Sequence, residues 1–198
     1  MKQKLFSITI ALAALTVTTE AATTVQNLNR TYQSESNAAN RYRQFASKAD
    51  AENLRQTAKL FRAAAVSEEI HSKIVARAIV KIGGRIDTFK LDAVTPGTTA
   101  ENLQSAIRDE TAESGTDYRG FLTIAKADRE KSAVRAFNYS MRSDKELATL
   151  FQHALDDIRG ETSITCYVCE DCGLVVIKLP EKKCPICREG LKEFKIIN

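Results

Sequence analysis

The sequence of 198 residues has no tryptophan, only 8 glycines and 3 prolines, and little net charge. So few turn-forming residues disfavour an all-β sandwich, which needs many tight turns, and favour long helices. The formal net charge of +4 gives no reason to expect a nucleic-acid partner. With 43% hydrophobic and 27% charged residues, the composition is that of an ordinary folded protein of one or two domains.

The N-terminal residues 1–21 have the pattern of a secretory signal peptide. A basic start from Met1 to Lys4 precedes an uncharged run from Leu5 to Val17, and small residues around Ala21 offer a cleavage site. This run is short for crossing about 30 Å of hydrocarbon, so an uncleaved membrane anchor is the weaker alternative. No other segment is apolar enough to span a membrane. We therefore expect an exported, periplasmic bacterial protein without a stable membrane span.

Apolar residues recur at spacings of three and four over four long segments of residues 22–160. This periodicity predicts a mainly α-helical domain, an antiparallel four-helix bundle. The predicted helices cover residues 25–50, 51–82, about 98–124 and 128–158. Gly83 and Gly84 are a stop signal for the second helix, and Thr98 with Glu101 forms a capping box that opens the third.

Each predicted helix places an acidic residue in its apolar stripe. A single such acid can be explained by a misjudged helix phase or by a carboxylate at the edge of the bundle. Several acidic residues buried together in one core destabilise the fold unless they are paired or bind cations. The acids are Glu35, Glu68, Glu110, Glu113 and Asp144. Because Glu68 and His71 lie one helical turn apart, both can reach one ion, and the whole pattern is that of ferritin-like di-iron bundles.

Two Cys-x-x-Cys pairs predict a small metal-binding β domain over residues 161–198. Cys169, Cys172, Cys184 and Cys187 can close a tetrahedral tetrathiolate site. So small a domain cannot fold on apolar burial alone, and the spacing does not distinguish an iron centre from a zinc ribbon that only holds the tail folded. Cys166 is a spare thiol close enough to compete as a ligand, and oxidation of a pair to a disulfide would abolish the site.

The mature chain resembles a rubrerythrin, in which a ferritin-like di-iron bundle precedes a rubredoxin-like domain. The matching segments are Glu35-Ser-Asn-Ala-Ala-Asn-Arg-Tyr42, Ala65-Val-Ser-Glu68-Glu-Ile-His71, Glu110-Thr-Ala-Glu113 followed by Tyr118, Cys169-x-x-Cys172-Gly and Cys184-Pro-x-Cys187. The resemblance implies two irons in the bundle and favours iron over zinc in the tail. It also implies an NADH-linked peroxidase that reduces hydrogen peroxide to water, with electrons passing from a rubredoxin or reductase type donor through the tetrathiolate iron.

The resemblance assigns further roles within the bundle. Tyr42 and Tyr118 match tyrosines that lie beside the di-iron centre of the family. One iron of that centre moves between a glutamate and a histidine as its oxidation state changes, and the matching pair is Glu113 and His71. The resemblance further implies a homodimer, in which the rubredoxin-like domain of one chain lies near the bundle of the other.

The fourth helix departs from the family pattern. It has Asp144 and Leu147 where a second Glu-x-x-His is expected, so the bridging carboxylate is shortened and the imidazole of the second iron is missing. Glu146 lies about 200° around the helix from Asp144, and His153 follows nine residues later, so neither substitutes without a change of phase. Three interpretations follow. The bundle holds an altered di-iron site completed by Asp144 or water, a one-metal site, or a degenerate site that only binds metal or transfers electrons.

Overall fold

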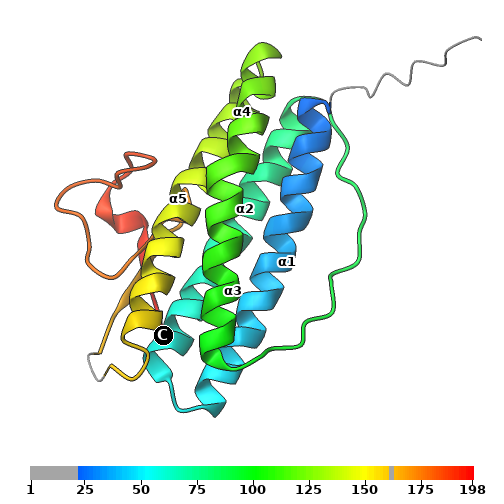
Figure 1. Ribbon diagram of the computed structural model, residues 1–198. Helices are drawn as coiled ribbons and strands as arrows, with labels where there is room; N and C mark the ends of the chain where they lie inside the picture. Colours follow the sequence, from blue (N-terminus) through cyan, green and yellow to red (C-terminus); the bar gives the residue numbers. More distant parts are fainter. Residues whose placement is uncertain (1–21, 161–162) are drawn as a thin grey trace, which may run out of the picture.

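The computed structural model describes residues 22–160 and 163–198, so the predicted signal peptide lies outside the described residues. The helices are α1 Thr24–Ala51, α2 Arg55–Lys81, α3 Thr99–Ala112, α4 Tyr118–Ala127 and α5 Lys131–Asp156. They form a four-helix bundle because η1, a π-helical turn over Glu113–Asp117, joins α3 to α4 in one line (Figure 1). None of the described helices is long and apolar enough to cross a membrane. The predicted fold class is confirmed.

The connection between α2 and α3 sets the order of the helices. It leaves one end of the bundle and runs along the outside of α1 to the other end, so that α2 and α3 run in the same direction (Figure 1). Asn37 of α1 holds this segment, because its side chain donates to Asp92 Oδ2 at 2.7 Å and accepts from the Asp92 N–H at 3.1 Å. One long crossover between two antiparallel helix pairs is the connectivity of ferritin-like bundles. At its end, the predicted capping box of Thr98 and Glu101 is present.

The π-helical turn changes which side chains of the third helix face the core. A regular helical period that continues from Glu110 and Glu113 predicts that Asp117, Phe121 and Ile124 point inward. The buried side chains after the turn are instead Tyr118, Leu122 and Ala125, each one position later, and Asp117 is only partly buried. The prediction for Asp117 is therefore wrong. A π-helical turn contains an extra residue relative to the α-helix, which rotates the following helix and brings Tyr118 into the core.

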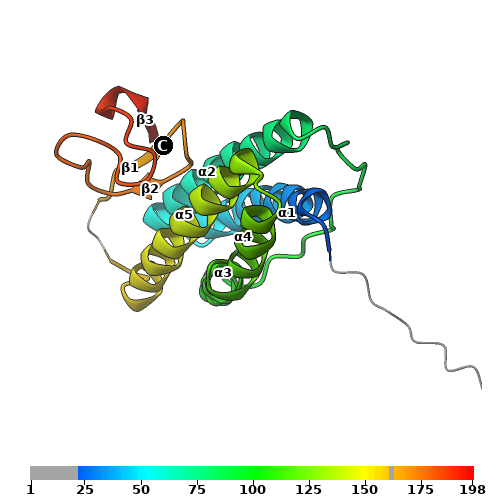
Figure 2. The same ribbon diagram turned by 90° about the horizontal axis from the view of Figure 1, so that it is seen from above.

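The tail forms a small antiparallel sheet beside the bundle. Its strands are β1 Cys166–Cys169, β2 Val175–Val176 and β3 Phe194–Ile197, in the order β2-β1-β3. The sequence from Leu174 to Leu179 has a β-like pattern, but only Val175–Val176 of it forms a strand. Figure 2 shows the sheet against the side of the bundle formed by α2 and α5, and both helices contact it. Cys166 is fully buried in the core that the tail shares with the bundle, outside the group of the other four cysteines.

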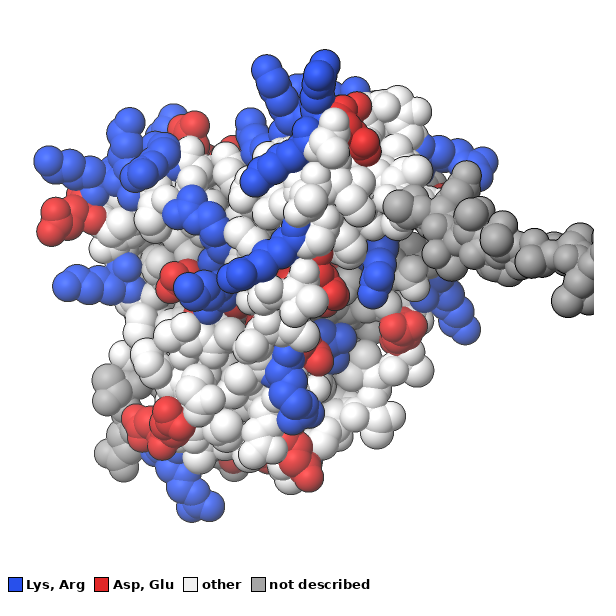
Figure 3. Space-filling view, turned by 45° about the horizontal axis from the view of Figure 1, so that its top comes forward, with Lys and Arg blue, Asp and Glu red and all other residues white. Residues whose placement is uncertain are grey.

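The surface is more basic than the formal charge suggests, because several carboxylates are buried in the bundle. In Figure 3, Lys and Arg side chains outnumber acidic side chains over the visible face, and acidic residues are dispersed among them. Glu35, Glu68, Glu110 and Asp144 are each at most 3% exposed. These interior acids are the distinctive chemical feature of the fold.

Candidate metal centres

The bundle core brings together acids from four helices. Glu35 comes from α1, Glu68 with His71 from α2, Glu110 from α3 and Asp144 from α5. Their ligand atoms form two sets, and within each set the atoms lie within 4.8 Å of one another. Glu35, Glu68 and His71 make the first set, and Glu68, Glu110 and Asp144 the second. Glu68 belongs to both sets and therefore lies where a bridging carboxylate is needed.

His71 faces the carboxylates through one ring nitrogen. Its Nδ1 lies 3.1 Å from Glu68 Oε2, 3.5 Å from Asp144 Oδ1 and 3.8 Å from Glu35 Oε2. The ring is fully buried. Its position one turn after Glu68 on α2 follows from the helical period, which directs residues i and i+3 to the same face.

The buried carboxylates are better suited to bind a cation than to form hydrogen bonds with one another. Both oxygens of Asp144, Oε2 of Glu35 and Oε1 of Glu68 are buried without a hydrogen-bond partner among the described residues. An ionised carboxylate buried in this way costs several kcal/mol unless a proton or a cation neutralises it. Hard oxygen donors with one imidazole suit iron and similar divalent ions. The residues present therefore fit the metal that the resemblance implies.

Burial and neighbouring charges favour the protonated form of several carboxyls in this group. Burial, together with the neighbouring charges of Glu35 and Glu110, raises the pKa of Glu68 well above its usual value. Burial likewise raises the pKa of Glu110 and of Asp144. Burial opposes ionisation of Glu35 as well, but the neighbouring carboxyl of Glu68 and the charge of His71 outweigh burial and lower the pKa of Glu35 to about 2. The shifts therefore favour ionised Glu35 beside protonated Glu68, and binding of a divalent cation would release protons from the group.

Two buried tyrosines orient the outer carboxylates. Tyr118 donates its hydroxyl hydrogen to Glu35 Oε1 at 2.5 Å, and Tyr42 donates to Glu110 Oε1. Both rings are at most 2% exposed. The placement agrees with the positions that the resemblance implies for them, and their part in a reaction stays a prediction.

Glu113 lies at the edge of the site. It begins the π-helical turn, is less buried than the other acids and belongs to neither ligand set. Ser34 of α1 donates a hydrogen bond to its Oε1 at 2.6 Å. Burial and the charge of Glu35 raise its pKa to about 7. A cavity of about 30 Å³ adjoins Glu113, Ser34 and Tyr118.

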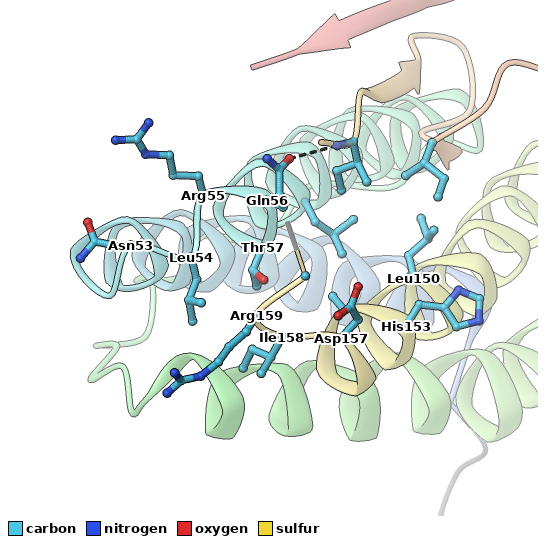
Figure 4. A pocket seen from close by; sticks show the side chains of 15 residues that line it. Asn53, Leu54, Arg55, Gln56, Thr57, Leu150, His153, Asp157, Ile158 and Arg159 are labelled. Atoms are coloured by element: carbon cyan, nitrogen blue, oxygen red, sulfur yellow. Dashed lines mark hydrogen bonds between the residues drawn. The ribbon is translucent and has the colours of Figure 1, made fainter. Parts of the chain in front are cut away.

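The fourth helix has no imidazole at the second ligand set. Leu147 is fully buried one turn after Asp144, in a cluster that contains Tyr42, Phe61 and Phe151. Glu146 is exposed. His153 is exposed as well and lines a cavity of about 430 Å³ with Leu150 and Asp157 (Figure 4). The helix therefore keeps the phase expected from its sequence.

The four clustered cysteines of the tail fit one tetrahedral metal ion. Cys169 Sγ lies 3.6 Å from Cys187 Sγ, and Cys172 Sγ lies 3.5 Å from Cys184 Sγ. Disulfide sulfurs are about 2.05 Å apart, whereas sulfurs on a tetrahedral ion with bonds of about 2.3 Å are separated by about 3.8 Å. The sulfur separations therefore match a metal site and not a disulfide.

The tail contacts the bundle site directly through α2. His71 Nε2 lies 3.2 Å from the carbonyl oxygen of Cys172, and Ser67 Oγ donates to the carbonyl of Gly173 at 2.7 Å. Since a carbonyl only accepts, Nε2 carries a hydrogen, and Nδ1 is the ring nitrogen that faces the carboxylates and could bind a metal. The sequence indicates neither contact. Gly173, which directly follows the first cysteine pair, was a possible sequence signal of this close approach. Its φ is +79°, and a Cβ there would lie 2.4 Å from His71 Nε2.

The second cysteine pair is held from α5. Arg142 donates from Nη2 to the carbonyl of Pro185 at 2.8 Å and from Nη1 to that of Ile186 at 3.5 Å. Arg142 is two residues before Asp144 and was missed by the sequence analysis, because an exposed arginine on a helix has no distinguishing pattern. The first cysteine pair is thus attached to α2, which carries Glu68, and the second pair to α5, which carries Asp144. Both of these carboxylates belong to the second ligand set.

The family of the chain follows from its similarity to known proteins. The Rubrerythrin family model matches residues 26–155. The chain belongs to the rubrerythrin family. Rubrerythrin-2 of Clostridium acetobutylicum is 32% identical over 179 residues, which cover 88% of this chain and 95% of that protein. Nigerythrin of Nitratidesulfovibrio vulgaris is 25% identical over 169 residues, which cover 85% of this chain and 84% of the relative.

The fold agrees with solved structures of this family. The mixed-valence state of nigerythrin superimposes with a TM-score of 0.81 at 24% identity and covers 93% of this chain and 91% of nigerythrin. As a rubrerythrin, the chain is a non-haem iron protein with a peroxidase-type role. It has a carboxylate and histidine site of the di-iron type and a rubredoxin-like iron site of four cysteines. The expectation of iron cofactors is confirmed.

Proposed function

We propose that this rubrerythrin reduces hydrogen peroxide to water in the bundle, with electrons that arrive through the four-cysteine centre. One observation carries the proposal: His71 lies between the two centres. Its Nδ1 is 3.1 Å from Glu68 Oε2, and its Nε2 is 3.2 Å from the carbonyl of the metal-ligating residue Cys172. A short, fully buried path therefore connects the tail to the site where peroxide would react.

The reaction H₂O₂ + 2e⁻ + 2H⁺ → 2H₂O requires electrons, protons and a site from which bulk water is excluded. Glu35, Glu68, His71, Glu110 and Asp144 would hold the metal ions, which when bound would supply electrons to the O–O bond. Tyr118 and Tyr42 hold Glu35 and Glu110 in place by hydrogen bonds, so these carboxylates need little reorganisation. Glu113 adjoins the cavity of about 30 Å³, where its carboxyl can carry protons to the interior from near the surface.

The proposal includes an outside electron donor, a homodimer and export. A rubredoxin or reductase type donor, itself supplied by NADH, would reduce the tail. Dimerisation is tested by sedimentation of the purified chain, which should give twice the monomer mass. Export is tested by N-terminal sequencing of protein from the periplasm, where the mature chain should begin near residue 22.

Peroxide reduction is tested with the full chain loaded with iron and reduced without oxygen. On mixing with hydrogen peroxide, we expect one peroxide consumed per two electrons and the appearance of the visible bands of the ferric tetrathiolate. Glu68→Gln should lose most of the rate because it removes the shared ligand. Glu69→Gln is the matched control, since Glu69 lies next to it on α2 but pairs with Arg43 at the surface. Equal rates for native protein and Glu68→Gln would refute the proposal.

A second candidate function is metal binding or electron transfer without peroxidase activity. It is favoured by one observation, the apolar Leu147 at the position of the second imidazole. The double change Asp144→Glu and Leu147→His restores the family pattern and should raise turnover with peroxide. Activity in the double variant and none in the iron-loaded native chain would establish this second candidate.

A further inference from the structure

The two metal positions of the bundle differ in ligand chemistry. The first set contains the imidazole of His71, whereas the second, Glu68, Glu110 and Asp144, contains only oxygen atoms. Asp144 is fully buried, and both of its oxygens lack a hydrogen-bond partner among the described residues. Such a carboxylate is stable only if a proton or a cation neutralises it, so this position is suited to hold an ion.

No second imidazole of this chain can reach the oxygen-only position. The sequence has 2 histidines, of which His71 belongs to the first set and donates from Nε2 to the tail. His153 is nine residues after Asp144, which is about 13 Å along the helix axis, and it lies at the exposed cavity of Figure 4. Leu147 occupies the nearest inward position and offers no ligand atom. Water must therefore complete the coordination of an ion held here.

We propose that this oxygen-only position accepts Mn²⁺, so that the chain assembles a centre with iron at His71 and manganese between Glu110 and Asp144. Imidazole ligands favour iron over manganese, whereas carboxylate and water ligands suit Mn²⁺. The loss of an imidazole therefore weakens the preference for iron at the second position only. This inference rests on the two metal positions of the proposed function but not on the peroxidase reaction.

Competition between the two ions tests the inference. The full chain, freed of metal, is loaded without oxygen with Fe²⁺ and a large excess of Mn²⁺, because most sites bind Fe²⁺ more tightly than Mn²⁺, and unbound ions are removed. Bound metals are counted by mass spectrometry, Mn²⁺ is observed by electron paramagnetic resonance, and tail iron is counted separately from its visible bands after oxidation. We expect about one manganese and one iron in the bundle of the native chain. Two bundle irons without manganese, or manganese equally in both positions, would overturn the inference.

Three variants make the test specific to the second position. Leu147→His supplies the missing imidazole and should lower manganese occupancy about tenfold in the same competition. Leu150→His is the matched control, because Leu150 lies one turn further along α5 at the cavity of Figure 4, and manganese occupancy should not change. If Leu147→His does not fold, Asp144→Asn keeps the shape and removes the charge, and should lose manganese while it retains the bundle iron. Loss of iron and retention of manganese in Asp144→Asn would contradict the assignment.

Peroxide consumption by the chain loaded with iron alone separates this inference from the proposed function. If the competition gives one manganese and one iron but the iron-loaded chain consumes no peroxide, the inference stands and the peroxidase proposal is refuted. Two bundle irons with rapid peroxide consumption would overturn the manganese inference and support the peroxidase proposal.

Discussion

Replacement of Gly173 by alanine should loosen the four-cysteine centre from the bundle. The φ of Gly173 is +79°, where an L side chain costs about 1–2 kcal/mol. The new Cβ would also lie 2.4 Å from His71 Nε2 and 3.2 Å from the carbonyl oxygen of Ser67. Because both residues are fully buried and cannot move aside freely, the crowding should cost about 1–3 kcal/mol more. We expect a total loss of about 2–5 kcal/mol in the free energy of unfolding.

Alanine variants of two other glycines separate the cost of backbone strain from the cost of crowding. Gly83 has a φ of +77° with nothing within 4 Å of a built Cβ, so Gly83→Ala should cost only the strain, about 1–2 kcal/mol. Gly190 also has open space and an ordinary φ of −73°, so Gly190→Ala should be neutral or stabilise by up to about 1 kcal/mol. Urea unfolding of the iron-loaded chains, followed by circular dichroism, measures all three.

Electron transfer gives a second measurement on the same variants. Peroxide oxidation of the bundle should be followed by oxidation of the tetrathiolate iron, and this second step should slow in Gly173→Ala because the contact of His71 with Cys172 is broken. Gly83→Ala and Gly190→Ala should leave the step unchanged. If Gly173→Ala is no less stable than Gly83→Ala and transfers electrons at the native rate, the argument from close contact is wrong.

Three further outcomes are expected. Cys184→Ser should remove the red colour of the ferric tail, whereas Cys166→Ser should keep it. Visible absorption of the purified variants measures this. A colourless native tail that contains stoichiometric zinc would contradict the prediction. Arg142→Gln removes a positive charge beside the second cysteine pair, so the reduction potential of the tail iron should fall by about 40 mV, equivalent to about 1 kcal/mol for one electron, in a spectroelectrochemical titration. Hydrogen bonds from Thr99 and Lys48 lower the pKa of Glu52 to about 2. This carboxylate therefore stabilises the fold above its usual pKa of 4.5. Because solvent screens the interactions of this partly exposed side chain, Glu52→Gln should cost only about 0.5–1 kcal/mol at pH 7, and the difference should vanish as the pH falls from 4.5 toward 2.

The sequence by itself determined the helices, the acids they carry inward and the two cysteine pairs. These features are local, because the helical period decides which residues share a face and a Cys-x-x-Cys spacing decides which thiols meet one ion. The placement of Glu68 and His71 on one face of α2 needed no tertiary information. The missing imidazole at Leu147 was equally visible, since the fourth helix keeps a regular phase.

Only the tertiary structure decided the phase of the third helix and the docking of the tail. The π-helical turn over Glu113–Asp117 moves Tyr118 into the core in place of Asp117, and the helical period alone does not indicate such an insertion. The contact of His71 with Cys172 joins residues 101 positions apart. It depends on how β1 packs against α2 and on the positive φ of Gly173, and packing between distant segments is set by their complementary surfaces and not by any local spacing.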